Sequence, residues 1–108
     1  MPTLETNPQY TRHHREIILQ RRKQVIVHAC IYYRLNDNLV SDQQWDHWNR
    51  ELAALQKAHP NCCNLNYYEV QFEDWKGTTG VEHILPLSDP KIIATAMWLI
   101  ENSRKNNI

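Results

Sequence analysis

The sequence is poor in residues that break regular structure, because its 108 residues include only two glycines, Gly77 and Gly80. Its cysteines, Cys30, Cys62 and Cys63, are odd in number and two of them are adjacent. This is a poor disulfide framework and predicts a reducing, cytoplasmic location. The chain also lacks an apolar run of the about 20 residues that span a bilayer, and its start lacks the apolar core of a signal peptide. We therefore expect no membrane partner.

Neither sign of charge is in excess, since 12 basic residues face 12 acidic ones. The distribution is uneven, because residues 1–34 hold six basic and two acidic side chains, a net charge of +4 that leaves −4 for the rest. Internal complementarity is the commoner use of such asymmetry. Arg21, Arg22 and Lys23 are expected on solvated turns of a helix. A phosphate contact from these three residues is the minority alternative, and it would make the chain a nucleic-acid accessory protein.

The start of one helix is specified better than any other element. Ser41 with Gln44 three residues later forms a capping box, in which each side chain satisfies a free backbone donor of the first turn. Val40 and Trp45 occupy the positions of a hydrophobic staple. The spacing of apolar residues beyond them predicts a helix over residues 42–59, which a proline then ends.

An unbroken stretch precedes this helix and predicts another over residues 11–35, with Thr11 as its cap. Turn residues at 36–38 then make the two helices an antiparallel hairpin, over residues 11–60. Residues 1–10 are expected to be a loose lead-in.

The second half has weaker signals. Partial alternation over residues 67–72 predicts a short strand or extended segment, and residues 74–86 a loop. Asp89 followed by Pro90 is a helix start, so a third helix is predicted over residues 91–103. The expected fold is mainly α: an antiparallel helical hairpin plus a C-terminal helix, with a short extended or loop segment between them. Residues 11–108 then form one small domain, in which 61–108 is an appended loop and helix.

Two carboxylates in the second helix leave a choice open. Asp42 and Asp46 are four residues apart, so on a helix they are neighbours and repel each other. The commoner explanation is that both face water and favour the helix dipole. The alternative is that they face a cationic or hydroxyl-rich ligand beside the paired aromatics Tyr32 and Tyr33.

The residues from the tyrosine pair onward have a recognisable spacing. Tyr32-Tyr33 is followed, after a turn of eight residues, by Asp42 and then by Trp45-Asp46. The same helix continues with the run R-E-L at residues 50–52 and ends in H-P at residues 59–60. In this respect residues 28–60 resemble the small N-terminal helical domain, domain Ia, of bacterial NAD-dependent DNA ligases.

This resemblance implies a ligand and the residues that bind it. In the ligases the domain closes over the nicotinamide mononucleotide (NMN) half of NAD. It implies that Tyr32, Tyr33 and Trp45 stack on the nicotinamide ring and that Asp42 and Asp46 make polar contacts. NMN or NAD would be a ligand, and no cofactor would be required. A cationic ring beside aromatic faces and carboxylates is physically favourable.

The sequence also departs from the ligases. Trp45 replaces their tyrosine, which retains an aromatic face but changes a phenol into an indole. The nucleotidyltransferase motif K-x-D-G occurs nowhere in the 108 residues, so no lysine can be assigned as the adenylated nucleophile. We therefore expect a non-catalytic module that cannot ligate alone.

A second resemblance covers the whole chain. Short stand-alone ligase-related proteins of bacteriophages and prophages similarly follow the hairpin with an aromatic-acidic segment, a T-G turn and an L-P-L-x-D-P run, here residues 85–90. This implies a phage-encoded protein of the host cytoplasm. The alternative function is a protein-interaction module that modulates a host enzyme or defence system and has not retained the pocket.

A metal site is not expected. His59, Cys62, Cys63 and His83 include zinc-ligand types, but a structural zinc site usually shows two ligand pairs with defined spacing, and only H-x-x-C is present.

Overall fold

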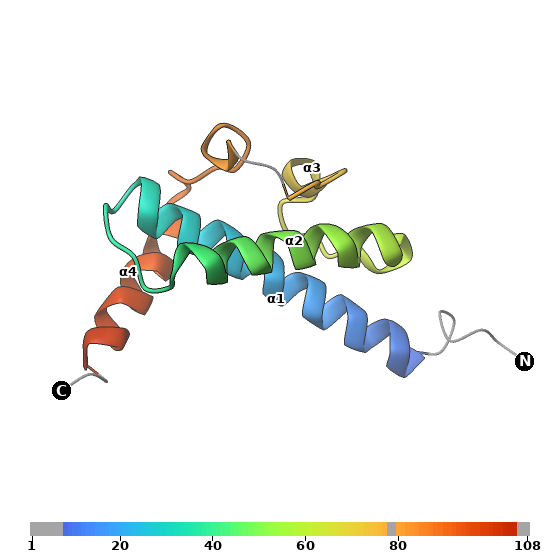
Figure 1. Cartoon of the computed structure of the whole chain (residues 1–108). Helices are drawn as coiled ribbons and strands as arrows, with labels where there is room; N and C mark the ends of the chain where they lie inside the picture. Colours follow the sequence, from blue (N-terminus) through green and yellow to red (C-terminus); the bar gives the residue numbers. More distant parts are fainter. Residues whose placement is uncertain (1–7, 78–79, 106–108) are drawn as a thin grey trace, which may run out of the picture.

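The computed structural model describes residues 8–77 and 80–105, and this part of the chain is mainly helical, as predicted (Figure 1). Four α-helices and two short 3-10 helices account for its regular structure, and no strand occurs in these ranges. Within them, no helix combines the length and apolar character required to cross a bilayer. The elements are α1 (Pro8–Tyr33), α2 (Asp42–Ala58), η2 (Pro60–Cys62), α3 (Glu69–Phe72), η3 (Val81–His83) and α4 (Pro90–Lys105).

Helix α1 is the central element, since both α2 and α4 pack on it. Its consecutive residues Val25, Ile26 and Val27 are all buried. A helix that is covered on several sides can carry apolar residues at consecutive positions instead of on one face. This explains why the β-branched run is helical and is not a strand. The helix begins earlier than predicted, so Thr11 lies inside it and is not its cap. The rest of the predicted lead-in, residues 1–7, lies outside the described residues.

The turn between α1 and α2 closes the predicted hairpin. The backbone N–H groups of Arg34 and Leu35 both donate to the carbonyl of Cys30, and that of Asp37 donates to Ile31. Asn36 has a φ of 53°, in the left-handed region that asparagine tolerates better than most residues. These bonds satisfy carbonyls at the end of α1 and return the chain toward the start of α2 (Figure 1).

The segment after α2 corrects a prediction, because residues 69–72 form the short helix α3 and not a strand. A strand would place Val70 and Phe72 on the same face, whereas Phe72 is buried in the core and Val70 is exposed. A longer-range contact sets the backbone here. The carboxylate of Glu69 accepts the N–H of Leu65 at 2.7 Å and a guanidinium N–H of Arg22 at 2.9 Å, which holds the chain in a tight turn.

Helix α4 begins at the predicted cap. Oδ1 of Asp89 accepts the N–H of Lys91 at 2.9 Å, and Ile92 and Ala96 are buried in the core. The opposite face of the helix, with Met97 and Trp98, is exposed. Figure 1 shows α4 packed beside the end of α1 that leads into the hairpin turn.

Candidate functional site

The start of α2 is held in place by its cap. The Ser41 hydroxyl accepts the backbone N–H of Gln44 at 3.0 Å, as the capping box predicts. Asp42 is the first residue of the helix, and the next turn carries Trp45 and Asp46. Because residues three and four apart share one side of a helix, these three side chains lie together near the end of α1.

A cavity of about 330 Å3 lies between the end of α1 and the start of α2, and we call it the notch. The described residues that line it come from α1, the hairpin turn and the first turns of α2, and none comes from residues 60–105. They are His28, Ala29, Tyr32, Tyr33, Asn38, Leu39, Val40, Ser41, Asp42, Trp45 and Asp46. The structure therefore brings together all five residues that the sequence singled out for a ligand.

The aromatic walls of the notch differ in rigidity. Tyr32 and Tyr33 meet edge to face, with ring centroids 4.9 Å apart, and both are substantially exposed. Trp45 is half-buried against the core, and its Nε1–H donates to the carbonyl of Val25 at 3.1 Å. The indole thus joins α2 to α1 and forms a fixed wall, while the two tyrosines form the open side.

The charge of the notch is negative. Asp42 is exposed, and Asp46 pairs with Arg50 one turn later at 3.0 Å, which partly offsets the repulsion between the two carboxylates. Among the described lining residues there is no lysine or arginine. Burial lowers the pKa of His28, so this histidine is neutral near pH 7 and adds no positive charge. The notch can therefore accept hydrogen bonds and attract a cation.

Comparison with known protein families gives a match. The family model of the DNA ligase-like, N-terminal NAD+-binding domain matches residues 11–67, which is more than half of the chain. The chain belongs to this family. No curated protein and no solved structure matches it.

The match defines a ligase-type domain, residues 11–67, that contains the hairpin and every residue of the notch. It extends the resemblance seen over residues 28–60 in both directions. The elements α3, η3 and α4 lie beyond it. The ligase-type domain is therefore the part of the chain for which family membership bears on the notch.

One of the three basic residues weighed as a phosphate contact is placed differently from its prediction. Arg22 is only 1% exposed, so the expectation that it lies on a solvated turn is wrong. Arg21 is partly buried and pairs with Glu51 at 3.1 Å, whereas Lys23 is exposed. Since Arg22 faces the interior, Arg21 and Lys23 are the two of these three residues that a nucleic acid could reach. Their role in nucleic-acid binding stays a prediction.

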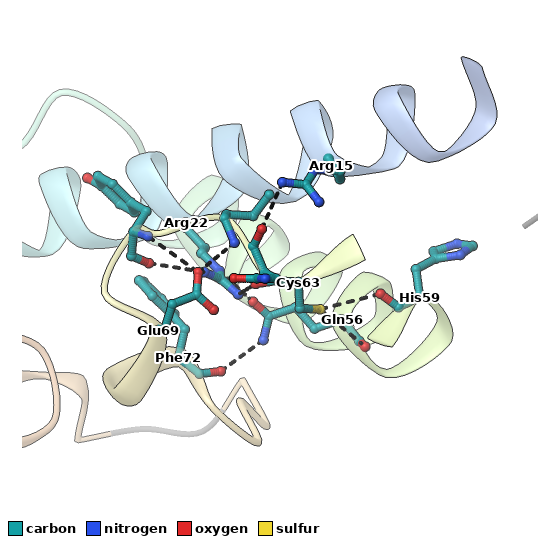
Figure 2. A network of polar contacts seen from close by, with 10 residues as sticks. Arg15, Arg22, Gln56, His59, Cys63, Glu69 and Phe72 are labelled. Carbon is teal, nitrogen blue, oxygen red and sulfur yellow. Dashed lines mark hydrogen bonds and ion pairs between the residues drawn. The ribbon is translucent and has the colours of Figure 1, made fainter. Parts of the chain in front are cut away.

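Arg22 is the centre of a polar network that sequence reasoning missed (Figure 2). Its guanidinium donates to Oε1 of Gln56 at 2.7 Å, to the carbonyls of Cys63 and Tyr67 at 2.9 and 3.0 Å, and to Glu69 at 2.9 Å. A buried guanidinium needs such partners to offset its loss of hydration. The network therefore fastens the segment after α2 to the hairpin.

Two lining features of the ligase-type domain were also missed. His28 lies one turn before Tyr32, so the i, i+4 spacing could have placed it on the same side of α1. Its ring packs against Trp48 with centroids 5.3 Å apart. Leu39 joins Val40, the predicted staple residue, in an apolar rim, and its direction could not be predicted because loop residues have no periodicity.

A second cavity, of about 990 Å3, lies between the C-terminal half of α2, which belongs to the ligase-type domain, and α3, which lies beyond it. Its walls include Ala53, Lys57, Val70 and Trp75, with the Arg22 network at its base. Acidic and basic side chains both line it, so it shows no preference for one charge. The notch is the cavity where sequence, geometry and charge agree.

Proposed function

We propose that this protein is a non-catalytic recognition module that binds the NMN half of NAD, or NMN itself, in the notch. The observation that supports this most strongly is that Tyr32, Tyr33, Trp45, Asp42 and Asp46 line one cavity. These are the residues that the resemblance to the ligase domain implies as ligand contacts. Membership of an NAD+-binding family makes a nicotinamide nucleotide the first ligand to test.

The chemistry of the notch fits that ligand. Electron-rich faces of tyrosine and tryptophan attract a cationic ring such as oxidised nicotinamide. The carboxylates of Asp42 and Asp46 can accept hydrogen bonds from ribose hydroxyls or from the amide N–H group. The volume of about 330 Å3 is at the lower end of the roughly 300–1,000 Å3 range of small-molecule sites. We therefore expect the notch to hold the mononucleotide half and to leave the adenylate half outside.

The residues present support a recognition role without catalysis. Adenylation of a ligase requires a nucleophilic lysine, and the sequence lacks the K-x-D-G motif that supplies it. The described lining of the notch consists of aromatic, apolar and acidic residues, with polar residues of the turn and a neutral histidine. These groups can bind and orient a nucleotide.

Isothermal titration calorimetry with NMN, NAD and AMP tests this function. We expect NMN and NAD to bind and AMP, which has no nicotinamide, to give no heat. Asp42→Asn should weaken NMN binding by about 5- to 30-fold. The reason is that a charge-assisted hydrogen bond contributes roughly 1–2 kcal/mol of net binding free energy after the hydrogen bonds to water that it replaces are subtracted. Glu101→Gln, on exposed α4, is the matched control. Folded wild-type protein that gives no heat at millimolar NMN would rule the function out.

A second candidate function is protein interaction, and one observation favours it. Met97 and Trp98 are 57% and 61% exposed on α4, outside the ligase-type domain. Large apolar side chains on a surface are typical centres of protein interfaces. If a host enzyme is the partner, Trp98→Ala should abolish its binding while Asp42→Asn leaves it unchanged. The phage origin and the host location remain predictions.

A further inference from the structure

The start of α2 brings to the notch a place where an anion would ordinarily bind. The free backbone N–H groups at the start of a helix attract phosphates and carboxylates. Here the Ser41 hydroxyl already accepts one of them, the N–H of Gln44, and the first residue of the helix is the exposed acid Asp42. A carboxylate at this position interacts favourably with the helix dipole and repels a second anion. The helix start in the notch is therefore a poor phosphate site.

The side chains of the notch do not compensate for this. No lysine or arginine is found among the described lining residues, and burial lowers the pKa of His28, which keeps its imidazole neutral near pH 7. Arg34 is exposed and lies outside the lining. Arg50 also lies outside it and pairs with Asp46 at 3.0 Å, so that this pair adds little net charge. Asp42 is thus the uncompensated charge in the described lining of the notch.

A nicotinamide mononucleotide carries opposite charges at its two ends. Its oxidised ring is a cation, which the faces of the aromatic lining residues and the carboxylate of Asp42 both attract. The ribose hydroxyls can donate hydrogen bonds to the same carboxylate. The phosphate is an anion, and the negative charge of Asp42 repels it. The notch therefore complements one part of this ligand and opposes the other.

We propose that the notch selects the nucleoside part of a nicotinamide nucleotide, the cationic ring with its ribose, and excludes the phosphate. Nicotinamide riboside, which lacks the phosphate, is then its preferred ligand. The ligand class is that of cationic nucleosides, and NMN and NAD bind through the part that they share with this class. This inference rests on the proposed function, since it concerns the same cavity and the same ring.

Nicotinamide riboside and NMN form a matched pair for the test, because they differ by the phosphate alone. Calorimetry measures the affinities of both ligands for wild-type protein and for Asp42→Asn. Glu73→Gln is the control, because Glu73 is an exposed acid that does not line the notch. Each titration is repeated in about 0.05 M and about 0.5 M NaCl, since salt screens exposed charges. Circular dichroism establishes that each variant is folded.

We expect wild-type protein to bind nicotinamide riboside roughly 2- to 5-fold more tightly than NMN at low salt, and this ratio to approach one at high salt. Asp42→Asn should weaken binding of both ligands and bring the ratio close to one at low salt, while Glu73→Gln should leave it unchanged. If wild-type protein binds NMN as tightly as nicotinamide riboside, or more tightly, this inference is overturned and the proposed function stands. A preference for the riboside that persists in Asp42→Asn would likewise overturn it. Absence of binding by either ligand would overturn both.

Discussion

The hydroxyl of Tyr68 donates a hydrogen bond to Oδ2 of Asp89 at 2.7 Å. The other oxygen of the same carboxylate accepts the N–H of Lys91 and caps α4. Tyr68 itself has a φ of 48°, in the left-handed region that is unfavourable for a tyrosine. One carboxylate thus joins the turn before α3 to the start of α4, and a strained backbone residue supplies the donor.

This contact predicts how stability changes in acid. The Tyr68 hydroxyl and the Lys91 amide lower the pKa of Asp89 below its usual 3.8. Since the folded pKa lies below the unfolded one, ionised Asp89 stabilises the fold above pH 3.8, and this contribution is lost as the pH falls through the folded pKa. Tyr68→Phe should make the loss of stability between about pH 5 and about pH 2 shallower. Urea denaturation across that range measures it.

The control for this prediction is Tyr32→Phe, which removes a phenol hydroxyl from the notch, far from α4 in the sequence. It should leave the loss of stability in acid unchanged. If Tyr68→Phe loses stability in acid as steeply as wild-type protein does, the hydrogen bond does not set the pKa of Asp89.

The Arg22 network predicts a large loss of stability on mutation. Arg22→Met keeps an unbranched apolar stem but removes the guanidinium, so Gln56 and two carbonyls lose a donor and Glu69 loses its cationic partner. We expect the free energy of unfolding to fall by about 3 kcal/mol, as when one partner of a buried ion pair is removed. Chemical denaturation measures the change. Arg12→Ala, an exposed position on the same helix, should change it by less than about 0.5 kcal/mol.

Ser41 predicts a smaller effect at the start of α2. Ser41→Ala removes the oxygen that accepts the N–H of Gln44 and should lower the free energy of unfolding by about 1 kcal/mol. Ser41→Asp should retain most of the stability, because aspartate caps helices and its charge favours the dipole. Thermal or urea denaturation compares them, with exposed Ser88→Ala as the control. Equal stability of Ser41→Ala and wild-type protein would contradict the capping role.

Parts of the fold set by local chemistry were predictable. The start of α2 at Asp42 and that of α4 at Pro90 follow from capping residues within one turn of each start. The helix at residues 69–72 was missed because a partner 47 residues away, Arg22, holds Glu69 in place. A window of sequence does not contain that partner. Three consecutive basic residues likewise do not reveal which of them points inward.

The same distinction applies to the candidate site, where some residues could be predicted from the sequence and others could not. The resemblance to the ligase domain implied Tyr32, Asp42, Trp45 and Asp46, and they lie together because helical spacing and a short turn fix their relative positions. Leu39 could not be predicted, since it lies in the turn before α2, where no periodicity fixes the direction of a side chain.

The hydrogen bond between Trp45 and the Val25 carbonyl has a consequence for how the notch binds a ligand. Because this hydrogen bond already immobilises the indole, the Trp45 side chain loses little conformational entropy when a planar ligand binds. The same rigidity restricts which ligands fit. A ligand too thick for the notch cannot displace Trp45 without weakening the packing of α2 on α1.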